Sequence, residues 1–210
     1  ELSMPYVDAQ AQEILEQYRE DLKPHLAKSR QVSDEEIEQW VSGSERQQEM
    51  AAGALQKMNM RQYTDLIQKL LDSEQLLDEF KGELIEAMME QKLDEEFKIV
   101  KNGMEIEFVP SLITPVSQDP VLKEADSILE RWLSCDNPSM LSFCRQLLEQ
   151  EVLEMRPMDF EGIAPQKLAA SLVRLVYQAM KDEDGWNQFA KDHQLEDTEA
   201  YPLLIEKRGD

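Results

Sequence analysis

The sequence predicts a mainly α-helical fold, with about eight helices in one or more bundle-like domains and one β-hairpin at about 97–109. Three observations support this prediction. Apolar residues recur at spacings of three and four through most of the chain, which is the period of a helix. Prolines or good N-cap residues stand where several of these patterns begin. A single stretch, FKIVKNGMEIEFV, reads instead as two strands joined by Asn-Gly.

Helical segments precede the hairpin. The first is predicted over residues 8–29, where apolar side chains keep the helical spacing. The second begins at a capping box, in which the Ser33 side chain and the Glu36 side chain each bond the other residue's backbone N–H. The pattern from 45 to 96 is almost wholly helical, with a break expected at Asp72–Ser73. These segments account for the chain up to the predicted hairpin.

The hairpin has a predicted register. Asn102-Gly103 is the preferred pair for a two-residue type I′ turn, because both residues tolerate positive φ. A two-residue loop pairs Lys98 with Glu107 and places one set of apolar residues on one face: Phe97, Ile99, Met104, Ile106 and Phe108. The other face carries Val100, Glu105 and the Lys98–Glu107 pair. A lone hairpin is marginal in water, so its apolar face is expected to pack on helices or on a partner.

A proline-rich stretch divides the chain. We predict an N-terminal helical region over 1–109, a linker over 110–120 and a C-terminal helical region over 121–210. The alternative is one continuous domain. In the C-terminal region, Asp119-Pro120, Asn137-Pro138 and Pro165 mark three helix starts, and a last short helix follows Gly185.

Common catalytic and cofactor motifs are missing. The seven glycines form neither of the usual phosphate-binding patterns, and the nucleophile pattern GxSxG does not occur. Of the two histidines, neither has a zinc-site partner at standard spacing, although Asp192-His193 resembles a metal-binding pair. Cys144 lies in an apolar helical pattern and is interpreted as a small core residue. We therefore expect no catalytic residues, no cofactor and no metal.

Charge constrains the partner. The formal net charge is -22, from 44 acidic and 22 basic residues, and the acidic excess runs through the whole chain. Such a chain repels nucleic-acid phosphates and anionic lipid surfaces and favours basic partners. No apolar run reaches the roughly 18 residues of a membrane span. We expect a protein partner with a basic or amphipathic segment, no direct nucleic-acid contact and no membrane insertion. Two cysteines that form no CxxC pair favour a reducing, cytoplasmic location.

The leading hypothesis is a non-enzymatic, acidic helical interaction protein: an adaptor, a chaperone or a regulatory subunit. Exposed strand edges and flexible Met side chains are recognised ways to bind a partner. The candidate partner-binding residues are Met58, Met60, Ile99, Val100, Glu105 and Glu107. Three alternatives remain. One is a DNA mimic that inhibits a nucleic-acid-binding protein, another is an enzyme with an unrecognised carboxylate or HD-type metal site, and the third is a structural subunit.

Overall fold

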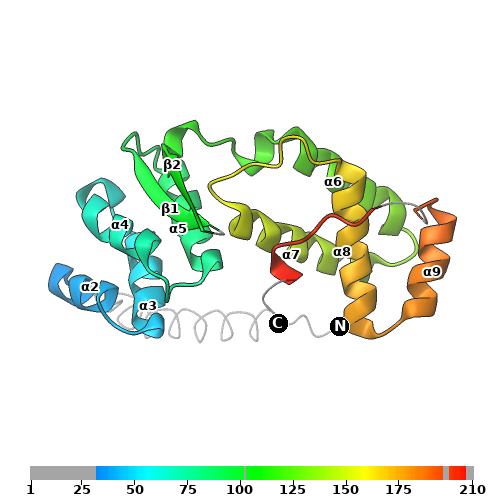
Figure 1. Cartoon of the computed structure of the whole chain (residues 1–210), viewed down its shortest axis with the longest axis horizontal. Helices are drawn as coiled ribbons and strands as arrows, with labels where there is room; N and C mark the ends of the chain where they lie inside the picture. Colours follow the sequence, from blue (N-terminus) through cyan, green and yellow to red (C-terminus); the bar gives the residue numbers. More distant parts are fainter. Residues whose placement is uncertain (1–31, 102, 196–198, 207–210) are drawn as a thin grey trace, which may run out of the picture. The chain divides into compact units, whose positions relative to one another are not determined.

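The computed structural model describes residues 32–101, 103–195 and 199–206 (Figure 1). The chain divides into two compact units, residues 1–38 and 39–210. The described residues form eight α-helices, α2 to α9, and one two-stranded antiparallel hairpin. This confirms the mainly α-helical fold with one hairpin. The helix predicted over residues 8–29 lies outside the described residues, and the division at 110–120 stays a prediction.

Helix α2 spans Asp34–Val41 and begins as the sequence predicts. The Ser33 backbone N–H donates to Glu36 Oε2 over 3.2 Å. In return, the Glu36 backbone N–H donates to Ser33 Oγ over 3.3 Å. Both halves of the capping box are therefore present.

The stretch predicted as almost wholly helical is interrupted twice, once where no break was expected. It contains α3 (Glu45–Leu55), α4 (Thr64–Asp72) and α5 (Asp78–Glu90). The break after Asp72 is confirmed. The unexpected break lies between α3 and α4 and includes a short 3-10 turn, Met60–Gln62.

The Gln91 side chain, directly after α5, explains the break between α3 and α4. The Met60 backbone N–H donates to Gln91 Oε1 over 3.1 Å, and Gln91 Nε2 donates to the Met58 carbonyl over 2.9 Å. The Arg61 guanidinium also donates to the carbonyls of Gln91 and Lys92, each over 2.7 Å. The Gln91 bonds satisfy the Met58 carbonyl and the Met60 N–H, which a continuous helix would have paired internally, and the Arg61 bonds satisfy carbonyls at the end of α5. Continuous helix in this part of the prediction was therefore wrong.

The hairpin consists of β1 (Phe97–Lys101) and β2 (Met104–Phe108), and its register is the predicted one. Gly103 has φ +77°, which suits a turn that needs positive φ. The two strands are covered unequally. Inward-facing residues of β1 are buried, and β1 packs against α4, whereas Met104 on β2 is 62% exposed. The predicted apolar face is therefore only partly covered.

Four helices follow the hairpin: α6 (Pro120–Leu133), α7 (Pro138–Met155), α8 (Pro165–Met180) and α9 (Glu183–Asp192). Asp119 and Asn137 cap α6 and α7 as predicted, by accepting backbone N–H bonds through their side chains. Helix α9 begins before Gly185, because the side chain of Asp182 caps it by accepting the Gly185 N–H over 2.9 Å.

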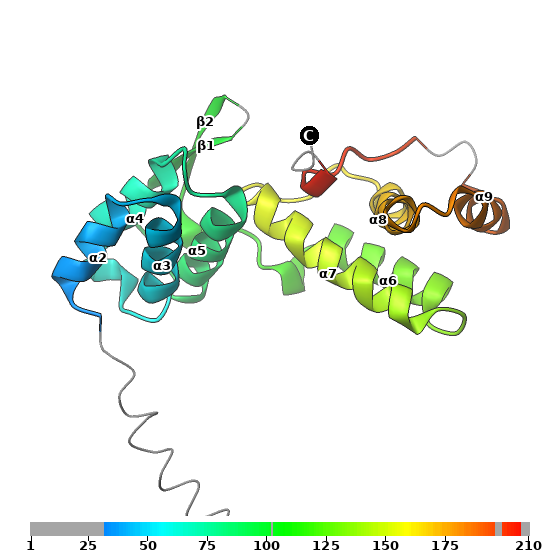
Figure 2. The same ribbon diagram turned by 90° about the horizontal axis from the view of Figure 1, so that it is seen from below.

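A hydrophobic core joins these last helices. Helices α6, α7 and α8 contact one another pairwise, and α9 packs on α8 (Figure 2). Buried apolar residues between them include Leu129, Cys144 and Leu172, each 0% exposed. Helix α7 also packs on α5, so elements from before and after the proline-rich stretch are in direct contact. That contact forms one wall of the groove described below.

Candidate binding surfaces

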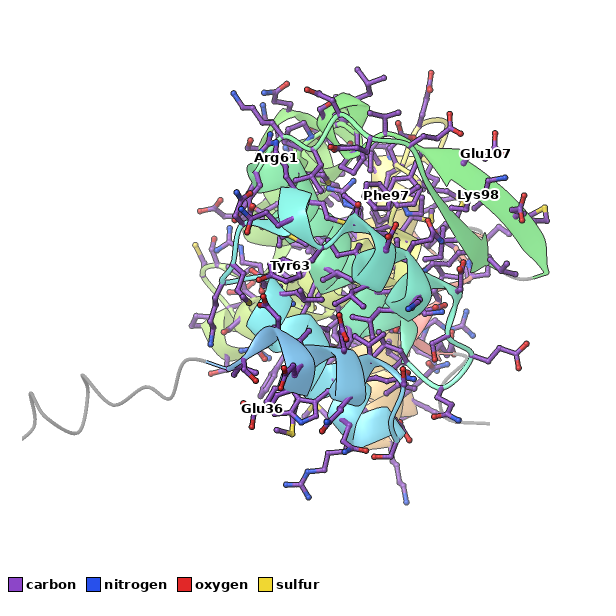
Figure 3. All side chains as sticks on the ribbon, turned by 90° about the vertical axis from the view of Figure 1, so that its left-hand side faces the viewer. Glu36, Arg61, Tyr63, Phe97, Lys98 and Glu107 are labelled. Atoms are coloured by element: carbon purple, nitrogen blue, oxygen red, sulfur yellow. The ribbon has the colours of Figure 1, made fainter. Side chains whose placement is uncertain are left out.

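The outer face of the hairpin carries three of the predicted partner-binding residues. Val100 is 53% exposed, and Glu105 and Glu107 are also exposed. The Lys98 amine lies 2.7 Å from the Glu107 carboxylate (Figure 3). It also lies 3.2 Å from the Glu105 carboxylate. Hydrogen bonds to Glu107 and then to Glu105 raise the pKa of Lys98. Exposed ion pairs of this kind contribute little stability, so their main effect is on the charge seen by a partner.

A side chain pairs with the outer edge of β1 at Lys98. Gln68 of α4 accepts the Lys98 backbone N–H and donates to the Lys98 carbonyl, each over 3.0 Å. The amide of Gln68 thus imitates a neighbouring strand. Backbone groups in an antiparallel pair point alternately toward and away from the partner strand. Glu107 lies opposite Lys98, so its N–H and C=O point away from β1, along the free edge of β2.

The other predicted residues are covered. Met60 and Ile99 are 0% exposed, and Met58 is half-buried. Met58 and Met60 lie in the break held by Gln91, where Met60 begins a short 3-10 turn, and not on an α-helix. Val100 and Glu105 are cross-strand neighbours, whereas the two methionines are held against the end of α5. Contact of any of the six with a partner stays a prediction.

A groove that sequence reasoning missed lies between α5, α6 and α7. It has a volume of about 500 Å³. The apolar part of its lining consists of Val116, Leu122, Leu148, Val152 and Leu153. Charged residues complete the lining: Glu86, Lys123, Asp126, Arg145 and Glu149. We call this surface the groove. No sequence signal marks it, because its residues come from three helices and the turn before α6.

Ion pairs fix part of the charged rim. Arg145 Nε donates to Asp126 over 2.6 Å, and a second guanidinium nitrogen reaches Glu130 over 3.3 Å. The hydrogen bonds to Asp126 are the main reason that the pKa of Arg145 is raised. Glu86 is bound by the guanidinium of Arg156, whose side chain is 2% exposed. These bonds hold the charged groups at the edge of the groove and leave its floor apolar.

A second cavity of about 510 Å³ contains two buried lysines. Lys101 Nζ donates to the Glu154 carbonyl over 2.7 Å and lies 3.4 Å from Asp78. Burial lowers the pKa of Lys101, and burial likewise lowers the pKa of Lys81. Lys101 therefore fastens the hairpin to α5 and α7. The sequence contained a signal for this burial. Lys101 follows Phe97 and Ile99 at a spacing of two and therefore lies on the same buried face of β1.

The residues considered for chemistry occupy packed positions. Cys144 is fully buried, which confirms the core interpretation, and burial raises the pKa of its thiol to about 12. The His193 ring packs against Phe189 and Trp132, with ring centroids 4.3 and 5.2 Å away. Within the described ranges, no group of three or more His, Cys, Asp or Glu side chains could hold a metal ion. None of the helices described is both long and apolar enough to cross a membrane.

Comparisons with protein-family models, with curated proteins and with solved structures find no match for this chain. Function is therefore inferred from the groove, the hairpin and the charge of the chain.

Proposed function

We propose that this protein is a non-enzymatic binding module, of the adaptor, chaperone or regulatory-subunit type, that holds a basic amphipathic segment of a partner protein. The groove carries this proposal, because a mainly apolar floor is bordered there by charged side chains. An amphipathic helix binds such a surface by placing its apolar face into the groove.

The groove's size suits this occupant. Its volume of about 500 Å³ is that of a small-molecule pocket, roughly 300–1,000 Å³, so it can accept several apolar side chains from one face of a helix. Leu148 and Val152 are four residues apart on α7 and therefore lie on the same face of that helix. Apolar side chains of a partner helix would lie against this row and against Leu122 of α6. These three residues are already largely buried, so most of the apolar area covered on binding would come from the partner helix and from Val116, which is 42% exposed.

Charge supports a basic partner. The groove's charged residues and the side chains that pair with them comprise Glu86, Asp126, Glu130 and Glu149 against Lys123, Arg145 and Arg156. Carboxylates thus outnumber cations locally, as they do over the whole chain with its net charge of -22. A field of this sign accelerates the encounter with basic segments and disfavours acidic ones.

Photo-crosslinking from the groove tests the proposal. A crosslinking phenylalanine analogue replaces Val116, which is 42% exposed and lines the groove. In an extract of cells that produce the protein naturally, the crosslinked segments should be identified by mass spectrometry. We expect segments with apolar residues at helical spacing and Lys or Arg on the opposite face. The control carries the same analogue in place of Phe143, which is 57% exposed on α7 outside the groove.

Charge variants make the test specific. Glu149→Lys reverses a charge in the groove lining and should reduce the crosslinking yield from position 116. Glu161→Lys makes the same change at an exposed residue outside the groove and should leave the yield unchanged. Crosslinked segments without helical apolar spacing, or equal yields from positions 116 and 143, would refute the proposal.

A further inference from the structure

We propose that the outer edge of β2, residues Met104–Phe108, binds an extended partner segment as a third, antiparallel strand, and that this segment alternates basic and apolar residues. This inference rests on the proposed function, since the segment belongs to the same basic amphipathic partner. It adds a second contact of a different kind, which uses backbone hydrogen bonds on the hairpin.

The two edges of the hairpin differ. Gln68 occupies the outer edge of β1 at Lys98 with a matched donor and acceptor. On β2, the backbone groups of Glu105 and Glu107 point away from β1 and bond to no other group in the described residues. Proteins commonly cover or blunt an exposed strand edge, because unpaired edges accept other strands. Here the edge of β1 is covered at Lys98, whereas the edge of β2 is open at both Glu105 and Glu107.

The strand with the open edge is also the less buried of the two. On β1, the inward-facing residues Phe97, Ile99 and Lys101 are all buried. On β2, only Phe108 is buried, Ile106 is half-buried and Met104 is 62% exposed. Another strand beside β2 would place its own apolar side chains next to Met104 and Ile106 and cover them. The open edge and the uncovered apolar residues therefore lie on the same strand.

The side chains of β2 specify the chemistry of the occupant. In an antiparallel pair, residues directly opposite each other lie on the same face of the sheet. Partner residues opposite Glu105 and Glu107 would lie beside two carboxylates that share one lysine, so Lys or Arg is favoured there. A second copy of this hairpin would bring Glu residues against Glu residues. Like charges directly opposite are destabilising, so a partner protein is the favoured occupant.

A synthetic peptide provides the probe. It has the length of β2 and alternates lysine with valine, and its binding is followed by NMR and amide hydrogen exchange of the full chain. We expect shifts and slowed exchange at the Glu105 and Glu107 amides. In the antiparallel arrangement, the lysines opposite these residues make the backbone bonds. N-methylation of the lysine backbone nitrogens should therefore abolish binding, and N-methylation of the valines should not.

A pair of variants tests the edge from the protein side. Glu107→Pro removes the outward N–H, at a position where an edge strand tolerates proline. Glu107→Gln keeps that N–H and removes the charge, so both variants lose the ion pair with Lys98. We expect Glu107→Gln to weaken peptide binding by a few-fold and Glu107→Pro to abolish it. The N-methylated peptides act on the wild-type protein, so they decide the question even if Glu107→Pro does not fold.

Four results would overturn the inference. These are peptide binding without protection of the two amides, no binding at all, equal loss for both methylated peptides, or self-association that protects the same amides without peptide. Failure here is distinguishable from failure of the proposed function. Crosslinking from position 116 reports the groove alone, and it should persist in Glu107→Pro if only the strand-addition inference is wrong.

Discussion

Replacing Gly82 with alanine should destabilise this protein, although alanine is the better helix former. Gly82 lies inside α5, where Gly costs about 1 kcal/mol relative to Ala. A Cβ atom at this position would lie 2.2 Å from the Leu153 carbonyl oxygen and 2.7 Å from its carbonyl carbon, both on the backbone of α7. Contacts of real Cβ atoms essentially never fall below 3.0 Å, so the two backbones must move apart by at least 0.8 Å, the difference between 3.0 and 2.2 Å.

The magnitude follows from two opposing terms. Overpacking costs about 1–3 kcal/mol, and the upper end applies because a helix backbone, unlike a flexible side chain, does not give way easily. Subtracting the propensity gain leaves a loss of about 2 kcal/mol in the free energy of unfolding. For a chain of this size, that loss lowers Tm by about 4–8 °C.

Gly53→Ala is the matched control. Gly53 also lies inside a helix, α3, but a Cβ atom there meets nothing within 4 Å. Only the propensity term applies, so this variant should gain about 0.5–1 kcal/mol. Urea unfolding followed by circular dichroism, with Tm from calorimetry, measures both variants. If Gly82→Ala stabilised the chain as much as Gly53→Ala, the close packing of α5 on α7 would be wrong, and with it one wall of the groove.

Three further predictions concern single side chains. Cys144 is buried and its thiol pKa is raised to about 12, so it should resist iodoacetamide in the folded protein, whereas the exposed Cys135 should react. Equal labelling of the two cysteines before unfolding would contradict the burial of Cys144. Gln68→Ala should speed hydrogen exchange of the Lys98 amide roughly fivefold, because a hydrogen bond of about 1 kcal/mol is lost. An unchanged exchange rate by NMR would show that Gln68 does not protect the edge of β1 at Lys98. Burial, and then Glu151, raise the pKa of Tyr201 from 10.0 to about 12, so the neutral phenol's contribution is complete below pH 10 and is lost as the pH rises toward 12. Tyr201→Phe should therefore reduce the decrease of the unfolding free energy between pH 10 and pH 12, measured by urea unfolding at each pH. The same decrease in the variant and the wild type would contradict the raised pKa of Tyr201.

Local features were predictable from the sequence. The capping box at Ser33 and the caps at Asp119 and Asn137 depend on residues within one turn of the helix start. Likewise, the hairpin register depends on the two-residue loop and on period-2 alternation, and both are visible in thirteen consecutive letters. Short-range chemistry of this kind leaves few alternatives.

Features that depend on distant residues were missed. The break between α3 and α4 depends on Gln91, which follows Met60 by 31 positions. Lys101 is buried because it reaches the Glu154 carbonyl, 53 positions away. The groove needs α7 in contact with both α5 and α6, and apolar periodicity predicts each helix without indicating which faces meet. Packing between distant elements decided these points, and among them only the burial of Lys101 had a sequence signal, its position two residues after Ile99 on the buried face of β1.

The deciding measurement is the affinity of the segment captured from position 116, made as a synthetic peptide and titrated calorimetrically into three proteins: wild type, Glu149→Lys and Glu161→Lys. If charge in the groove guides binding, Glu149→Lys should weaken the affinity by roughly three- to tenfold, about 0.7–1.4 kcal/mol, and Glu161→Lys should leave it unchanged. Wild-type affinity should also fall as salt shortens the screening length from about 10 Å at 0.1 M to about 3 Å at 1 M. Equal affinity for all three proteins, unchanged by salt, would contradict the proposal that this acidic chain holds a basic segment in the groove.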